Sequence, residues 1–243
     1  MRLPDFSNEL PRPTKKMDAA QKGQLLLRYV NSRQSVTDLD FSAASLQNAD
    51  LRGANLAGVD LSDALMFGAD LQQADLSGAN LERANLQRAR LVDTDLRNAR
   101  LVASALESAL LGGADLRFAQ LSHARMQYAN LMHADLTDAD LREVNLQRAR
   151  LRQASLVRAD LRGADLRWAD LLMTELQGAH TNDQTIRKSD WSPAAVRDLV
   201  ERGLQISDRA PLQEDAQDAD DTTGAEAPRE GLLLRLARPP SPI

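Results

Sequence analysis

The sequence ADLSGANLERANLQRAR, residues 74–90, repeats its apolar residues at every fifth position. Leucine stands at positions 76, 81 and 86, and alanine stands two positions before each leucine. An α-helix repeats about every 3.6 residues and a β-strand about every 2, so neither buries these leucines on one face. A chain that turns a corner at each pentapeptide does bury them. The leucine and the alanine then point inward, and the other three residues point outward.

The five-residue period extends over more than half of the chain. From residue 41 to residue 176 every fifth position is leucine, except Phe41, Met66 and Met126. This makes twenty-eight pentapeptides with no insertion or deletion. The position two residues earlier is mostly alanine, and the departures from alanine are Leu39, Val59, Thr94, Ser104, Val144 and Thr174. With only 3% aromatic residues, the predicted core consists of leucine and alanine.

Two segments, ADLRGANL at 49–56 and ADLRGADL at 159–166, resemble the A(D/N)LXX pattern of the pentapeptide-repeat family. The resemblance covers about 140 residues and implies an all-β fold, a right-handed quadrilateral β-helix with four pentapeptides in each coil. The chain would then form about seven coils and a rod roughly 34 Å long. Each fully buried leucine would contribute about 1.5–3 kcal/mol, and the two ends would need caps.

We expect four segments along the chain. Residues 1–38 form an N-terminal segment whose helix, predicted over 14–31, caps the first coil. Residues 39–180 form the solenoid, and 181–206 form a C-terminal cap with a helix. Residues 207–243 form a disordered acidic linker and a short apolar tail motif.

The C-terminal cap contains a helix signal in WSPAAVRDLVERG, residues 191–203. Ser192 is the expected N-cap, Pro193 the first helical residue and Gly203 the stop. A second interpretation comes from the family resemblance, because gyrase-targeting members dimerise through their C-terminal ends. The same segment is therefore also a candidate homodimer interface.

The last residues read REGLLLRLARPPSPI, 229–243, after a stretch that is acidic, small and polar. Leu232, Leu233 and Leu236 have helical spacing, and the prolines beyond them would stop a helix. A flexible acidic linker followed by a short apolar end is typical of a docking motif, so these leucines are candidate partner-binding residues. The alternative is an end that folds back on the rod.

No catalytic arrangement emerges from the sequence. The chain has no cysteine, and its three histidines are His123, His133 and His180. In a four-sided coil residues twenty apart stack, so His123 and His133 fall on opposite faces and form no zinc site or catalytic triad. No glycine-rich phosphate loop is present. We expect a protein that is not an enzyme and that has no cofactor and no metal.

Charge and hydropathy exclude further classes. The formal net charge of −5 argues against direct nucleic-acid binding. No signal peptide is recognisable, and no stretch approaches the roughly 20 apolar residues of a membrane-spanning helix. We expect a cytoplasmic protein with no membrane contact.

One outward column contains aspartates at every twentieth position, namely Asp75, Asp95, Asp115 and Asp135. Some members of the family imitate the DNA duplex with a negative rod and occupy DNA gyrase, so these four residues are the candidate DNA-mimic ladder. Arg97 and Arg117 lie on the same face and weaken this interpretation. The late coils are also basic, and the gyrase-targeting members tend to have phenylalanine where this chain has leucine.

A second outward column places Tyr128, Arg148 and Trp168 in consecutive coils, with Phe67 on the same face. Arg148 would lie between two aromatic rings. In a chain so poor in aromatic residues, these four residues are a candidate partner-binding surface. Exposed single aromatics are also common and need no functional explanation.

The leading functional hypothesis is a non-enzymatic protein–protein interaction module or scaffold, a rigid rod whose C-terminal tail docks on an unidentified protein partner. The second hypothesis, from the family resemblance, is a DNA-mimicking modulator of a type II topoisomerase. Its partner would be DNA gyrase or topoisomerase IV, and the effect would be protection or inhibition.

Overall fold

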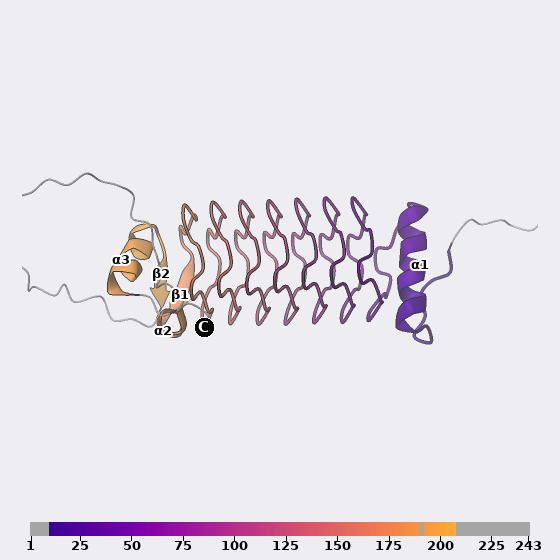
Figure 1. The fold of residues 1–243 in the computed structure, drawn as a ribbon, viewed down its shortest axis with the longest axis horizontal. Helices are drawn as coiled ribbons and strands as arrows, with labels where there is room; N and C mark the ends of the chain where they lie inside the picture. The colour runs from indigo at the N-terminus through magenta and orange to yellow at the C-terminus, as the bar shows by residue number, and fades with distance from the viewer. Residues whose placement is uncertain (1–9, 190–191, 208–243) are drawn as a thin grey trace, which may run out of the picture.

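A computed structural model describes residues 10–189 and 192–207 of the 243-residue chain. A stack of coils joins a helix at one end of the molecule to a group of short elements at the other (Figure 1). In chain order the elements are α1 (Ala19–Asn31), β1 (His180–Asn182), α2 (Asp183–Ser189), α3 (Pro193–Glu201) and β2 (Gln205–Ser207). The candidate tail residues Leu232, Leu233 and Leu236 lie outside the described residues.

The coil repeats every twenty residues. Parallel bridges join residues twenty apart, from the pair Asp40 and Asp60 to the pair Asp160 and His180. Each coil therefore contains four pentapeptides, as the family resemblance implied. In each pentapeptide the residue two positions after the buried leucine, or its substitute, has a positive φ, for example 60° at Tyr128. This left-handed residue makes the corner that an apolar period of five requires.

The core consists of two rows of side chains. The central row contains every fifth residue from Phe41 to Leu176, and the small row contains the residue two positions before each of them, mostly alanine. Every central residue from Phe41 to Leu176 is buried, and Leu171, at 7% exposed, is the most accessible. Two departures from alanine in the small row are hydrogen-bonded inside: the Oγ1 atoms of Thr94 and Thr174 each donate to a carbonyl oxygen of the preceding coil at 2.8 Å. The interior of each coil is thus closely packed.

α1 begins at Ala19, so the predicted start at residue 14 is wrong. The reason is a capping box at Asp18: its Oδ1 accepts from the backbone N–H of Gln21 at 2.8 Å, while Gln21 Oε1 accepts from the N–H of Asp18 at 3.0 Å. These reciprocal bonds satisfy two backbone donors and set the first turn.

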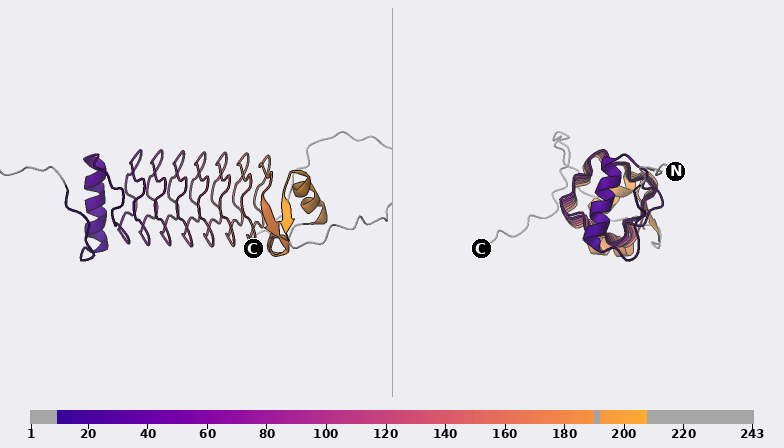
Figure 2. Two further views of the ribbon diagram at one scale, coloured as in Figure 1. Left: turned by 180° about the vertical axis from the view of Figure 1, so that it is seen from behind. Right: turned by 90° about the vertical axis from the view of Figure 1, so that its right-hand side faces the viewer.

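α1 lies across the open end of the first coil (Figure 2). The carbonyl of Ala19 accepts from the N–H of Ser45 at 2.8 Å, so the helix takes the place of a missing coil. Gly23 faces the same residue, and a Cβ at this position would collide with the Ser45 carbonyl oxygen. The ammonium of Lys22 donates to Asp40 Oδ1 at 3.2 Å and to the Ser42 carbonyl at 3.0 Å. Close contact and partly buried polar bonds thus cover the end of the core.

The other end is closed by β2, which pairs in parallel with β1 so that Gln205 lies beside His180. α3 has the caps that the sequence predicted: Ser192 Oγ accepts from the N–H of Ala195 at 3.2 Å, Pro193 is the first helical residue, and Gly203 has φ of 100°. Within the described residues no helix is long and apolar enough to cross a membrane.

α2 was not predicted, and it supplies side chains that the last coil needs. Thr185 Oγ1 donates to the carbonyl of Leu161 at 2.8 Å and accepts from the N–H of Gly163 at 2.8 Å. Ser189 Oγ accepts from the N–H of Leu166 at 3.0 Å. Since no further coil follows, these hydroxyls take the place of backbone partners.

Candidate interaction surface

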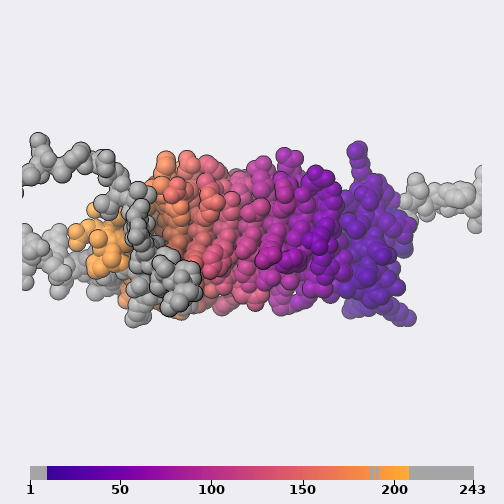
Figure 3. Space-filling view, in the orientation of Figure 1, coloured from indigo at the N-terminus to yellow at the C-terminus, as the bar shows by residue number. Residues whose placement is uncertain are grey.

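The solenoid presents its outward side chains in columns, because residues twenty apart occupy equivalent places in successive coils. On the face shown in Figure 3 the stacked coils form a continuous surface between the two capped ends. A partner would therefore meet rows of side chains. One corner column consists of Asn48, Gly68, Arg88, Ser108, Tyr128, Arg148 and Trp168.

The structure brings three predicted site residues of this column together. The Arg148 guanidinium lies 5.7 Å from the ring centre of Tyr128 and 5.1 Å from that of Trp168. Tyr128 is 56% exposed and Trp168 42% exposed. Arg167 also lies over the Trp168 ring, at 5.7 Å. The arrangement expected from the column is thus present, and its role in binding stays a prediction.

Phe67, the fourth predicted residue, lies apart from this group. It is half-buried and packs under the guanidinium of Arg88, which is 5.7 Å from the ring centre. Arg88 and Arg148 stand three coils apart in the corner column, at a separation of about 14 Å for a coil spacing of about 4.8 Å. The column therefore carries two separate groups of cation–π contacts, one around Arg88 and one around Arg148.

Ion pairing distinguishes these arginines from the rest of the solenoid. Within residues 39–180, all of which the structure describes, all arginines except three form an ion pair with a carboxylate. The three arginines without such a pair are Arg88, Arg148 and Arg150. All three lie at one corner of the coil.

The residue one coil earlier explains the difference. Arg83 and Arg158 occupy corners too, but an aspartate precedes each by twenty residues, and the pairs Arg83–Asp63 and Arg158–Asp138 are 2.6 and 2.5 Å long. Arg88 follows Gly68, and Arg148 follows Tyr128. With no carboxylate in reach, these two guanidiniums lie over rings instead.

The neighbouring column extends this corner and was missed by the sequence analysis. It runs through bridged residues Arg90, Leu110, Asn130 and Arg150. We call the combined surface the arginine–aromatic edge, which consists of Arg88, Arg90, Leu110, Tyr128, Arg148, Arg150 and Trp168. Leu110 is 40% exposed. Reading two adjacent columns together, in steps of twenty, would have revealed the edge from the sequence.

The aspartate ladder is interleaved with arginine. Arg97 lies 2.5 Å from Asp95 and 3.7 Å from Asp115, and Arg117 lies 2.6 Å from Asp115 and 3.6 Å from Asp135. The hydrogen bond from Arg97 lowers the pKa of Asp95 against the opposing effect of burial. The partial neutralisation expected from the sequence is therefore present. Asp75, at the end of the ladder, accepts from the backbone N–H of Ser77 at 2.9 Å.

The model for the family described as pentapeptide repeats matches eight copies in this chain, over residues 37–70, 64–101, 99–138 and 134–171. The chain belongs to the pentapeptide-repeat family. Among curated protein sequences, none matches this chain.

Three solved structures show what this pentapeptide-repeat protein is similar to. HetL, a pentapeptide repeat protein involved in heterocyst differentiation regulation from the cyanobacterium Nostoc, is 34% identical, with 60% of this chain and 77% of HetL covered and a TM-score of 0.42. QnrB1, a plasmid-mediated fluoroquinolone resistance protein, is 20% identical over 72% of this chain and 86% of its own, with a TM-score of 0.38. Rfr23 from the cyanobacterium Cyanothece is 34% identical over 43% of this chain and 61% of its own, with a TM-score of 0.21. TM-scores this low add no argument about partners.

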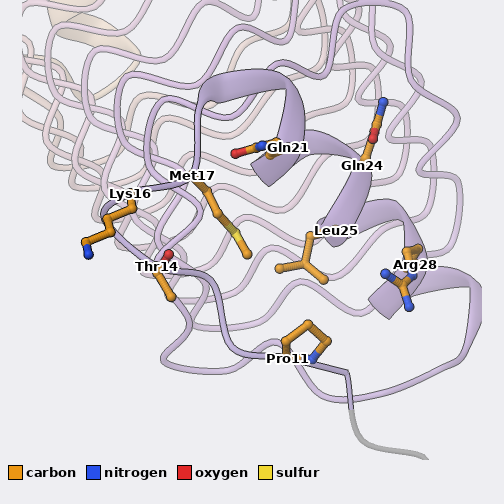
Figure 4. A pocket seen from close by; sticks show the side chains of 8 residues that line it. All are labelled: Pro11, Thr14, Lys16, Met17, Gln21, Gln24, Leu25 and Arg28. Atoms are coloured by element: carbon orange, nitrogen blue, oxygen red, sulfur yellow. The ribbon is translucent and has the colours of Figure 1, made fainter.

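The pentapeptide-repeat protein also has a groove at its N-terminal end, of about 460 Å³, between the segment that precedes α1 and the helix itself (Figure 4). Pro11, Met17 and Leu25 supply its apolar wall, and Lys16 and Arg28 stand at its margin. Among the described residues no group of histidine, aspartate and glutamate side chains could hold a metal ion.

Proposed function

We propose that this pentapeptide-repeat protein is a non-enzymatic protein–protein interaction module or scaffold, a right-handed quadrilateral rod that presents the arginine–aromatic edge to a protein partner in the cytoplasm. The observation that carries the proposal is the placement of Arg148 between Tyr128 and Trp168, two exposed aromatic side chains in a chain with 3% aromatic residues.

The physical support is preorganisation. Tryptophan, tyrosine and arginine dominate the binding energy of protein interfaces. Here the stacked arginine is already held by two rings, so little side-chain entropy remains to be lost on binding. The backbone N–H groups of Tyr128 and Arg148 donate coil hydrogen bonds, to the Gln147 carbonyl at 3.0 Å and to the Arg167 carbonyl at 2.9 Å. The edge is thus a rigid surface before the partner arrives.

The C-terminal tail is the second proposed contact. Leu232, Leu233 and Leu236 would dock on the partner assembly after the acidic linker. A full chain compared with one that ends at residue 228 tests this part: loss of the partner with unchanged thermal unfolding of the rod supports docking, and retention of the partner refutes it.

The edge itself is tested by crosslinking and affinity capture from host lysate with two matched variants. Trp168→Asn removes an aromatic that is 42% exposed, and Phe118→Asn removes one that is 55% exposed at a corner of another column. Both residues have positive φ, which asparagine tolerates well. The proposal requires loss of the same captured proteins with Trp168→Asn alone. Equal capture by both variants would refute it.

A second candidate function is a DNA-mimicking modulator of a type II topoisomerase, DNA gyrase or topoisomerase IV. The four-residue column from Asp75 to Asp135 favours it, and the ion pairs of Arg97 and Arg117 with this column weigh against it. A supercoiling assay with purified gyrase decides between the two. Gyrase protection or inhibition that disappears with Asp75→Asn and Asp135→Asn would put mimicry first.

A homodimer through the C-terminal cap stays a prediction. Val200 of α3 is 37% exposed and offers an apolar contact on this end of the molecule. Sedimentation equilibrium of the full chain, compared with Val200→Asp, measures whether a dimer forms and whether α3 contributes to it.

A further inference from the structure

The arginine–aromatic edge is a positive surface on a negative protein. Its two columns, read from residue 88 to residue 168, contain four arginines and no carboxylate, whereas the whole chain has a formal net charge of −5. Asp70 and Asp170 bound the second column at its two ends. In the column of residues 87, 107, 127, 147 and 167 beside it, the one carboxylate is that of Glu107, which is paired with Arg125 at 2.7 Å. The charge of the edge is therefore not neutralised from its sides.

Three of its four arginines retain their hydrogen-bonding capacity for a ligand. Arg88, Arg148 and Arg150 form no ion pair within the described solenoid, and the fourth, Arg90, has only a long contact of 3.5 Å to Asp70. A guanidinium that stacks on a ring still donates in its own plane, because the ring occupies only its face. Carboxylates match this planar set of donors and accept two hydrogen bonds from it.

The spacing suits an extended chain. Arg88 and Arg148 are three coils, about 14 Å, apart, and an extended peptide rises about 3.3 Å for each residue. Carboxylates about four residues apart along a peptide would then meet both arginines. Between them lie Leu110, 40% exposed, and Tyr128, 56% exposed, which would contact apolar side chains of the same peptide.

Resting on the proposed interaction function, we infer that the arginine–aromatic edge binds an extended acidic segment of the partner protein, in which carboxylates at intervals of about four residues alternate with apolar side chains. A nucleic acid fits less well. The positive surface is short, it ends at Asp70 and Asp170, and the protein as a whole would repel a polyanion.

The test uses the full chain and two labelled peptides in fluorescence anisotropy. One peptide carries glutamate at its first, fifth and ninth positions with leucine and alanine between them, and the other carries glutamine at those positions. We expect the glutamate peptide alone to bind, with an affinity that falls as salt is added. Arg148→Gln should weaken binding about tenfold, since it removes a charge-assisted hydrogen-bonding group.

Arg158→Gln is the matched control, because it removes the same charge from an equivalent corner where Asp138 already occupies the guanidinium. It should leave peptide affinity within about twofold of the wild type. Thermal unfolding of both variants shows whether each is folded. Equal affinity of Arg148→Gln and wild type for the glutamate peptide would overturn the inference.

Two other outcomes would also overturn it. Tighter binding of a single-stranded oligonucleotide than of the peptide, lost with Arg148→Gln, would assign the edge to nucleic acid. Peptide binding that begins only after the carboxylates of residues 214–221 are neutralised would assign the edge to this chain's own acidic segment.

The inference and the proposed function fail separately. Partner capture that is lost with Trp168→Asn while the glutamate peptide does not bind would remove the acidic ligand and leave the interaction module in place. Partner capture unaffected by Trp168→Asn would remove the module itself, whatever the peptide does.

Discussion

Two buried hydroxyl groups in the small row differ in whether they have a hydrogen-bond partner. Thr94 Oγ1 donates to the carbonyl of Leu71 at 2.8 Å. Ser104 is fully buried in the same row, and its Oγ has no hydrogen-bond partner. A buried hydroxyl without a partner costs free energy that alanine, the usual residue of the row, would avoid.

Ser104→Ala should therefore stabilise the protein, by about 1 kcal/mol, because it removes the unpaired group and fits the row. Thr94→Val, which keeps the shape and removes a made hydrogen bond, should destabilise it by a similar amount. Denaturant midpoints of the two variants measure both effects. A loss of stability with Ser104→Ala would show that its hydroxyl has a partner in solution.

An arginine two residues after an aspartate forms an ion pair with it on the surface of the coil. Arg52 donates to both carboxylate oxygens of Asp50, at 2.8 and 2.7 Å. The side-chain hydrogen bond from Arg52 lowers the pKa of Asp50 to about 2. Because the pKa is lower in the folded state, the pair stabilises the fold above about pH 4 and loses this effect as the pH falls towards about 2.

NMR titration of the Asp50 carboxyl should give a pKa of about 2 in the wild type. In Arg52→Gln it should return towards the ordinary value of about 3.9. Asp140, whose pKa the hydrogen bond from Arg142 lowers, serves as an internal control that Arg52→Gln leaves unchanged. Equal Asp50 titration in both proteins would mean that the pair does not persist in solution.

At the scale of elements, α1 acts as a substitute for a coil. The carbonyl of Ala19 accepts a hydrogen bond from the backbone N–H of Ser45, as a residue of a preceding coil would do. Leu26 is fully buried against the first coil. Gly23 permits this approach, because the Ser45 carbonyl oxygen occupies the place of a side chain. The glycine that lowers helix propensity is thus required by packing.

Gly23→Ala separates propensity from packing by the sign of its effect. Propensity alone predicts a gain of about 1 kcal/mol in a helix interior. Packing predicts a loss of about 1–3 kcal/mol, since the helix must move away from the coil. We expect the loss. Gln24→Ala, at an exposed position of α1, is the control and should change the free energy of unfolding by less than about 0.5 kcal/mol.

At the scale of the whole molecule, each coil contacts only its neighbours and the caps, so stability is a sum of local terms. Leu106 lies in the central coils and is 1% exposed, while Leu65 occupies an outward position and is 41% exposed. The two leucines therefore report on burial within one architecture.

Leu106→Ala should cost about 2–5 kcal/mol through the cavity it leaves. In hydrogen exchange its loss of amide protection should be largest in the adjoining coils and should fade towards α1 and β2. Leu65→Ala should cost less than about 1 kcal/mol. Uniform loss of protection along the whole rod would show that the solenoid unfolds as a single unit.

The sequence by itself determined the coil and the surface columns. An unbroken period of five favours a coil that buries both leucine and alanine, and the resemblance to the pentapeptide-repeat family implied the four pentapeptides per coil that stack residues twenty apart. The contact of Arg148 with Tyr128 and Trp168 follows from that stacking. The caps of α3 were predicted separately, from local signals at Ser192 and Pro193.

Only the tertiary structure decided the ends and which arginines of the solenoid stay without an ion pair. α2 and the docking of α1 depend on backbone groups that the terminal coils leave unpaired, and these groups lie far away in the sequence. At a corner, whether an arginine pairs with a carboxylate or lies over a ring depends on the side chain that its guanidinium meets in the neighbouring coil. Arg158 finds Asp138 there and Arg148 finds Tyr128, so the same residue type becomes part of an ion pair at one corner and a free positive surface at another.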